Sequence, residues 1–272
     1  MYKIIACDLD ETLLNSERKV SKKDAESIKK ATELGVKFVL ATGRGFPSVD
    51  GTLKEVGLFQ KPNEYVISFN GGAITENQGN RLINAELISF NFTNALFKRG
   101  WNYDVCIHVY TLDTVYVFRI NQSEKNYISG RMAVVERSED NIDFLKNEKL
   151  VKILYVNEDQ DYLHKIAAEV SDITGEADVS YSSNRYLEFN RKGVNKGAGL
   201  LKLAEILGVD QKDTIAIGDN FNDLAMIQAA GLGIGVANSV AGIRPDCQYI
   251  TEHDNNHDAI SEVIEKFILN HD

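Results

Sequence analysis

Residues 2–12 read YKIIACDLDET, an apolar run that ends abruptly in acidic residues. A short apolar run without polar alternation is typical of a parallel β-strand that is buried on both faces. The stretches VKFVLATGR at 36–44 and EYVISFNGGA at 64–73 repeat this pattern, and helical segments separate the three runs. Residues 1 to about 80 therefore read as βαβαβ, which predicts a parallel sheet with right-handed crossovers.

The first of the intervening helices is indicated by its ends as well as by its pattern. Ser21 is a suitable N-cap, because its hydroxyl can accept a hydrogen bond from a free backbone N–H of the first turn. Apolar side chains follow at intervals of three or four residues, and Gly35 ends the segment. The stretch 21–35 is therefore expected to form an amphipathic helix.

The pattern changes after Asn80. Residues 104–120 alternate apolar and polar side chains around a turn at Leu112-Asp113, which predicts an antiparallel hairpin with one solvated face. Further elements of this region are two strands at 152–157 and 178–189, the second with a turn at Ser183-Asn184, and a helix at 159–171. The middle of the chain thus reads as a separate α+β module.

The α/β pattern returns at Lys196. Its predicted elements are helices at 196–208 and 222–231 and strands at 213–219 and 233–237. The simplest topology is an α/β protein with a doubly wound parallel-sheet, Rossmann-like core. The core takes residues 1–81 and 188–272, and an α+β domain is inserted at 82–187.

Charge and cysteine content exclude several classes of protein. The formal charge of -10 argues against a nucleic-acid partner, which requires a surplus of lysine and arginine on at least one face. Cys7, Cys106 and Cys247 are far apart and lack metal-ligand spacing, as expected in a reducing compartment. No stretch approaches the ~20 apolar residues of a membrane span, and the N-terminus shows no signal-type segment. We expect a cytoplasmic protein without a membrane partner.

Polar residues follow the predicted core strands at the positions where ligands bind in an open parallel sheet. These residues are Asp8 and Asp10 after the first strand, Thr42, Gly43 and Arg44 after the second, and the segment Gly218-Asp219-Asn220-Phe221-Asn222-Asp223 at the late strand. Lys196 opens the helix that precedes this late strand. A single aspartate at a strand end is often only a turn or cap residue. The coincidence of carboxylates, a hydroxyl, an amide and a lysine at the ends of several strands favours a functional site instead.

These residue types suit phosphoryl transfer. Asp8 and Asp10 are two residues apart and would repel each other unless a cation lies between them or one is protonated. Hard carboxylate oxygens from Asp8 and Asp219 suit Mg²⁺, which keeps its other positions for water and substrate phosphate. Lys196 would neutralise the transferring group, while Thr42 and backbone N–H groups would bind its oxygens.

The segments DLDET, TGR and GDNFND together with Lys196 resemble the four motifs of the haloacid dehalogenase-like (HAD) phosphatases. The long insertion after the third strand is similar to that of the Cof-type, type IIB subfamily, in which it forms a cap domain. The resemblance implies that Asp8 is the nucleophile and that Asp10 is the general acid and base. It also implies magnesium ligands at Asp8, Asp219 and, through its backbone carbonyl, Asp10.

The same resemblance implies the remaining roles. The phosphate would be held by the backbone of Leu9, by Thr42 with Gly43, by Lys196 and by Asn222, and Asp223 would orient the lysine or a metal-bound water. Glu11 stands where the family usually has Gly or Asn, and little consequence is expected. Arg44 is a candidate for substrate or cap contact, or for a surface ion pair. Asn70 and Gly71 resemble an NGA segment that lines the pocket, and a plain glycine turn is the alternative.

The sequence therefore predicts a magnesium-dependent phosphatase of small phosphorylated metabolites. A sugar phosphate is the expected substrate by analogy with the subfamily alone. Two other functions remain open. A sugar phosphomutase would share the nucleophile and the acid but return the phosphate to a sugar hydroxyl. A non-catalytic phospho-acceptor module would also place an aspartate near magnesium and lysine, although it would have no need of Asp10 as an acid.

Overall fold

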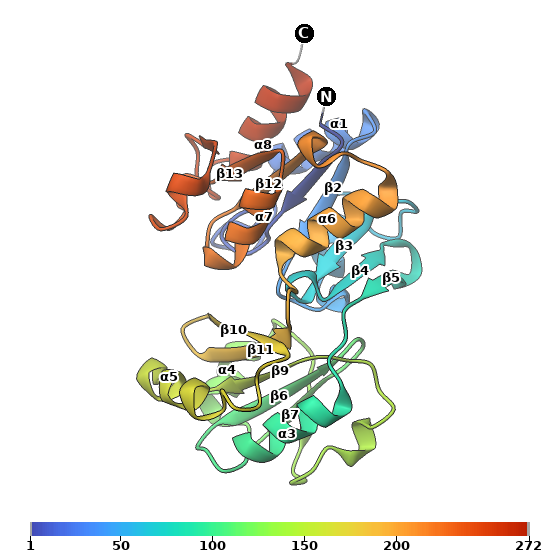
Figure 1. Cartoon of the computed structure of the whole chain (residues 1–272). Coiled ribbons are helices and arrows are strands. Elements are labelled where there is room, and N and C mark those ends of the chain that lie inside the picture. Colours follow the sequence, from blue (N-terminus) through green and yellow to red (C-terminus); the bar gives the residue numbers. More distant parts are fainter. Residues whose placement is uncertain (1, 271–272) are drawn as a thin grey trace. The chain divides into compact units, whose positions relative to one another are not determined.

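The computed structural model describes residues 2–270, which divide into two compact units. Unit 1 combines the chain up to Asn84 with the chain from Asn195 onward, and unit 2 comprises Ala85–Val194 (Figure 1). Each division falls a few residues beyond the boundary expected from the sequence. No helix in residues 2–270 is both long enough and apolar enough to cross a bilayer.

Unit 1 is built on an eight-stranded sheet, counted over the described residues, with strand order β14-β13-β12-β1-β2-β3-β4-β5. Its strands are β1 (Ile4–Cys7), β2 (Lys37–Ala41), β3 (Tyr65–Ser68), β4 (Ala73–Glu76), β5 (Arg81–Ala85), β12 (Thr214–Gly218), β13 (Leu232–Gly235) and β14 (Tyr249–Ile250). Its α-helices are α1 (Lys22–Glu33), α2 (Asp50–Glu55), α6 (Lys196–Leu207), α7 (Leu224–Ala229) and α8 (Ala259–Ile264). Shorter helical turns are η1 (Phe46–Val49), η2 (Phe69–Gly71), η3 (Gln78–Asn80), η5 (Gln211–Asp213), η6 (Phe221–Asp223), η7 (Arg244–Asp246) and η8 (Glu265–Leu269).

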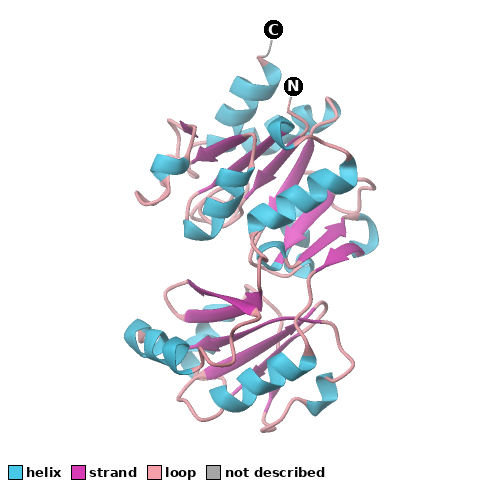
Figure 2. Ribbon diagram, viewed as in Figure 1, coloured by secondary structure: helices cyan, strands magenta, loops and turns pink. Residues whose placement is uncertain are grey.

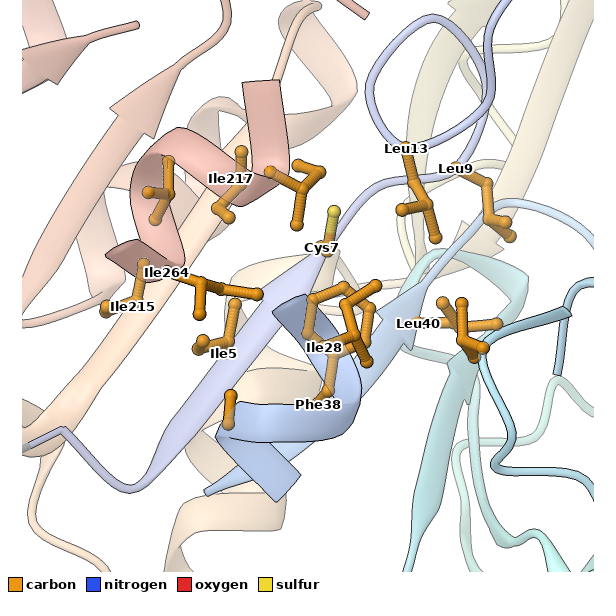
Figure 3. Close-up of a cluster of buried hydrophobic side chains, with 14 of the residues drawn as sticks. Ile5, Cys7, Leu9, Leu13, Ile28, Phe38, Leu40, Ile215, Ile217 and Ile264 are labelled. Atoms are coloured by element: carbon orange, nitrogen blue, oxygen red, sulfur yellow. The ribbon is translucent and has the colours of Figure 1, made fainter. Parts of the chain in front are cut away.

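Helices cover both faces of this sheet. Since alternate residues of a strand point to opposite faces, one strand contributes to the apolar core on each side. Ile5 and Cys7 of β1 belong to a core cluster that includes apolar residues of α1, α2 and α8. Ile4 and Ala6 belong to a second cluster, with residues of α6 and α7. Figure 3 shows part of the first cluster, where Ile5 and Cys7 are drawn with Phe38 of the neighbouring β2. The doubly wound α/β core is therefore confirmed.

The central strands run as predicted. Strand β1 pairs in parallel with β2 and with β12, and β2 pairs in parallel with β3. At one edge the sheet departs from the prediction, since β4 pairs with β3 in the antiparallel direction and β5 follows it. The turn after β3 returns the chain at once, so the sheet is mixed at this edge. The strands from β3 through β1 and β12 to the opposite edge at β14 are all parallel.

Helix α1 confirms the predicted capping. The Ser21 hydroxyl accepts a hydrogen bond from the backbone N–H of Asp24 at 3.0 Å. Gly35 has φ of +89°, the left-handed conformation that ends many helices. Ile28 and Ala31 are buried against the sheet.

Unit 2 contains a six-stranded sheet over the described residues, with strand order β10-β11-β9-β6-β7-β8. Its strands are β6 (Cys106–Thr111), β7 (Val115–Phe118), β8 (Val135–Arg137), β9 (Leu150–Val156), β10 (Ala177–Ser182) and β11 (Tyr186–Arg191). Its helices are α3 (Phe90–Gly100), α4 (Gln122–Ile128), the short η4 (Asp143–Leu145) and α5 (Gln160–Glu169) (Figure 2). Apolar residues of α3 and α5 form one cluster with the sheet.

The predicted hairpins of unit 2 are present, but one expectation about exposure is wrong. Strand β6 pairs antiparallel with β7, and β10 with β11. All six residues of β6 are buried, whereas the alternation predicted one solvated face. Polar residues of β6 are covered within the unit: the ring of His108, for example, lies 3.4 Å from the carboxylate of Glu124 in α4. The sequence analysis also missed the short strand β8, which pairs in parallel with β7.

Candidate active site

The carboxyl ends of β1, β2 and β12 bring together side chains that are far apart in the sequence. Because β1 lies between β2 and β12, the residues that follow these strands share one edge of the sheet. The backbone N–H of Asp8 donates to the carbonyl of Ile217 at 2.9 Å, which ties the end of β1 to β12. All of the predicted site residues lie in unit 1.

Lys196 is the centre of a buried charge cluster. It is the first residue of α6, where the side chain of Asn195 caps the helix by accepting from the N–H of Ala198 at 2.9 Å. Its ammonium group donates to Oδ1 of Asp8 and, at 2.6 Å, to Oδ1 of Asp223. The Lys196 side chain is fully buried, so its charge is held by these two carboxylates rather than by water.

Asp223 has both oxygens occupied by contacts that shape the turn after β12. Its Oδ2 accepts from the backbone N–H groups of Asp219 at 3.0 Å and Asn220 at 3.2 Å. A Cβ at Gly218 would collide with the Asp223 side chain, so only glycine allows this close approach. The carboxylate of Asp223 is thereby positioned to orient Lys196.

Asp219 is the third carboxylate of the cluster and contacts a residue to which the sequence analysis gave no role. Its Oδ1 accepts from the hydroxyl of Thr12 at 3.0 Å. The DLDET segment does contain a signal for this contact, because a hydroxyl follows the two aspartates in the same loop. Burial, together with the neighbouring carboxylate of Asp223, raises the pKa of Asp219 to about 7.

The cluster carries an excess of negative charge. Burial also raises the pKa of Asp8 well above its usual range, although Lys196 acts in the opposite direction. Carboxylate oxygens of Asp8, Asp219 and Asp223 lie within 4.8 Å of one another. Three buried carboxylates face one lysine, so a cation would relieve both repulsion and desolvation. The all-oxygen donor set fits a hard divalent ion such as Mg²⁺.

The structure separates Asp10 from this cluster. The Asp10 side chain is 54% exposed, and its two carboxylate oxygens accept from Nε and Nη2 of Arg44, the first at 3.0 Å. The sequence left open whether Arg44 contacts the substrate, the cap or an ion-pair partner. In the structure it forms an ion pair with Asp10. The two residues follow the adjacent strands β1 and β2.

Thr42 and Gly43 form the turn after β2. Thr42 is buried, and its hydroxyl accepts from the backbone N–H of Arg44 at 3.1 Å. The loop after β3 lies against this turn, because the N–H of Asn70 donates to the carbonyl of Thr42 at 2.9 Å. Gly71 faces the carbonyl of Asn195, where a Cβ would collide.

The remaining predicted residues differ in exposure. The Leu9 side chain is fully buried in the core, so only its backbone is available to a ligand. Asn222 is exposed beside the buried Asp223. Glu11 has φ of +62°, the left-handed region that glycine and asparagine adopt most readily.

Sequence comparison relates the chain to a known family of proteins. The sequence model of a family described as haloacid dehalogenase-like hydrolase matches residues 5–264. The 5-amino-6-(5-phospho-D-ribitylamino)uracil phosphatase of Bacillus subtilis (strain 168) is 29% identical over 267 residues, 98% of this chain and 96% of that protein.

Solved structures show the same architecture. A haloacid dehalogenase-like hydrolase from Bacteroides thetaiotaomicron is 27% identical, with a TM-score of 0.83 over 97% of this chain and 99% of that chain. A HAD subclass IIB sugar phosphatase, 18% identical, shares the fold with a TM-score of 0.81 over 97% of this chain and 98% of that chain.

Proposed function

The chain belongs to the haloacid dehalogenase-like hydrolases and is a phosphatase of phosphoric monoesters, and from that premise we propose that it acts through an aspartyl-phosphate on Asp8. The observation that carries the proposal is the buried contact of Asp8 with Lys196, beside Asp219 and Asp223. Burying a carboxylate costs desolvation free energy. Carboxylates in such places therefore often serve as nucleophiles or metal ligands. The same arrangement supports a dependence on Mg²⁺.

In the first step a carboxylate oxygen of Asp8 attacks the phosphorus of the ester. The bond between phosphorus and Asp8 forms while the bond to the leaving oxygen breaks, and Asp10 gives that oxygen a proton. Lys196 offsets the negative charge of the transferring group, and Asp223 holds the lysine in place. The backbone of Leu9, Thr42 with Gly43, and Asn222 would complete the phosphate site.

In the second step Asp10 takes a proton from water, which attacks the phosphorus and releases phosphate from Asp8. The Asp10 carboxylate must exchange its contacts with Arg44 for contact with the leaving oxygen or the water. Asp8, Asp219 and the backbone carbonyl of Asp10 would hold the magnesium ion, which supplies positive charge against the phosphoryl oxygens.

Unit 2 is proposed to be the type IIB cap, and we assign to it the choice of leaving group. None of the residues with a proposed chemical role lies in Ala85–Val194. A small phosphorylated metabolite that carries hydroxyl groups is the proposed substrate class, with a sugar phosphate as its first member to test. The relative that acts on a phospho-ribityl compound supports this class.

Cys7, Cys106 and Cys247 are free thiols in the structure, which supports the proposed cytoplasmic location.

One set of assays tests the proposal. The wild-type protein should hydrolyse p-nitrophenyl phosphate with Mg²⁺, lose activity in EDTA and regain it when Mg²⁺ is restored. Asp8→Asn should abolish turnover, because an amide is neither a competent nucleophile nor an anionic ligand. Asp210→Asn is the matched control, since this carboxylate is exposed and forms a surface ion pair with Lys212. Full activity after exhaustive chelation, or in folded Asp8→Asn, would refute the proposal. Product analysis with a bisphosphorylated sugar distinguishes hydrolysis, which releases inorganic phosphate, from return of the phosphate to a sugar hydroxyl.

A further inference from the structure

The segment that follows β3 has an unusual backbone. Phe69, Asn70 and Gly71 have φ of +53°, +54° and +96°, so three successive residues lie in the left-handed region. Two of them carry side chains, for which this conformation is unfavourable. Strained backbone of this kind persists only where the surrounding structure imposes it, and it occurs often at functional sites.

Neighbouring loops hold this segment firmly in place. The N–H of Phe69 donates to the carbonyl of Arg44 at 3.0 Å, and that of Asn70 to the carbonyl of Thr42 at 2.9 Å. The Phe69 ring is buried and packs edge-on against Phe46, with 6.3 Å between the ring centres. On the other side, Gly71 lies against the carbonyl of Asn195, the residue before Lys196. The segment is therefore fixed between the two loops that carry Thr42 and Lys196.

The Asn70 carboxamide is presented toward the turn at Gly43. A Cβ built on Gly43 would lie 3.2 Å from Oδ1 of Asn70, so the amide covers this glycine directly. Oδ1 is buried, and no donor among residues 2–270 hydrogen-bonds to it. A buried acceptor without a donor is unfavourable, and it points to a partner that the protein does not itself supply.

We propose that Asn70 is a specificity-determining residue whose Oδ1 accepts a hydrogen bond from a hydroxyl group of the leaving group. This inference rests on the proposed function, in which the turn at Thr42 and Gly43 binds the phosphate. Oxygens of a phosphate dianion are acceptors and cannot satisfy a carbonyl oxygen. Either a bound water or the organic part of the ester can supply the donor. In a sugar or polyol phosphate the nearest ester donor is the hydroxyl on the carbon next to the phosphoester carbon, and we assign the donor to this group.

The test compares two esters of equal chain length. sn-Glycerol 3-phosphate carries the adjacent hydroxyl, and n-propyl phosphate lacks it. Dissociation constants are measured by calorimetry with Mg²⁺ in full-length Asp8→Asn protein, so neither ester is consumed. Asn70→Gly removes the amide and keeps the backbone, because glycine adopts a φ of +54° without strain. Asn63→Gly is the matched control, since Asn63 has φ of +58° and is exposed before β3.

We expect Asn70→Gly to weaken binding of glycerol phosphate about tenfold and to change binding of propyl phosphate less than about twofold. Asn63→Gly should change neither. Equal weakening of both esters would overturn the inference, because it would mean that the amide nitrogen contacts the phosphate. Unchanged binding of both would overturn it as well. The proposed function is judged separately, by p-nitrophenyl phosphate turnover in the wild-type protein.

Discussion

Replacing Asp219 by asparagine should stabilise the metal-free protein in mildly alkaline solution, although it destroys a proposed metal ligand. Asp219 is 4% exposed, and burial beside Asp223 raises its pKa to about 7, from an ordinary value of 3.8. The unfolded chain therefore releases this proton at lower pH than the folded chain does. Between those two pH values the folded protein holds the extra proton, so its stability falls as the pH rises.

The size of the effect follows from the same two values. Each unit of pKa difference corresponds to about 1.4 kcal/mol, so the full penalty is about 4 kcal/mol. It is absent below about pH 4 and complete above about pH 7. Asparagine carries no charge at any of these values, and its carbonyl oxygen can still accept from the hydroxyl of Thr12. At about pH 8 the metal-free variant should therefore be more stable than the metal-free wild type by up to about 4 kcal/mol.

Urea unfolding followed by circular dichroism at about pH 5 and pH 8, with EDTA or with excess Mg²⁺, measures this difference. Mg²⁺ at about 100 times its dissociation constant should stabilise the wild type by about 2.7 kcal/mol and Asp219→Asn far less. Asp210→Asn, at a side chain that is 72% exposed, is the matched control and should follow the wild type throughout. Equal stability of metal-free wild type and Asp219→Asn at both pH values would refute the reasoning.

Three further substitutions examine neighbouring features. Asp10→Asn should slow hydrolysis of an alkyl phosphate by ~100- to 10,000-fold and that of p-nitrophenyl phosphate less, with a burst of p-nitrophenol in rapid-quench experiments. Equal losses for both esters without a burst would show that Asp10 is not the acid. Lys196→Gln leaves the carboxylates of Asp8 and Asp223 without their buried partner, so unfolding should require about 3–5 kcal/mol less at pH 8; a smaller change would show that water reaches them. Glu11→Gly should stabilise the protein by about 1 kcal/mol in thermal unfolding, because glycine relieves a φ of +62°; an unchanged or lower midpoint contradicts this.

Local elements with strong signals of their own were predictable from the sequence. The cap at Ser21 and the turn at Ser183-Asn184 depend on residues that are neighbours in the chain, and both are present. At the turn both residues have positive φ, 54° and 49°, as tight hairpin turns require. The central parallel strands were also predictable, since uninterrupted apolar runs indicate strands buried on both faces.

Elements with weak local signals were not predicted. Strands β4 and β5 extend the core sheet, with β4 antiparallel to β3. Their own residues do not indicate which strand they pair with. Strand β8 is three residues long and exposed or partly exposed, so it carries little apolar pattern. The expected solvated face of β6 is absent because other parts of unit 2 cover its polar side chains. The ring of His108, for example, is buried 3.4 Å from the carboxylate of Glu124.

The sequence alone established that Asp8 and Asp219 follow core strands and that Lys196 begins a core helix. This was possible because the chemistry of each motif is contained in a few adjacent residues. Only the tertiary structure decided how these groups are paired. Lys196 lies 188 residues from Asp8 in the sequence, and it contacts Asp8 and Asp223 because of which strands are neighbours in the sheet. The ion pair of Arg44 with Asp10 has the same origin. The raised pKa of Asp219 likewise depends on burial and on charges brought together by folding.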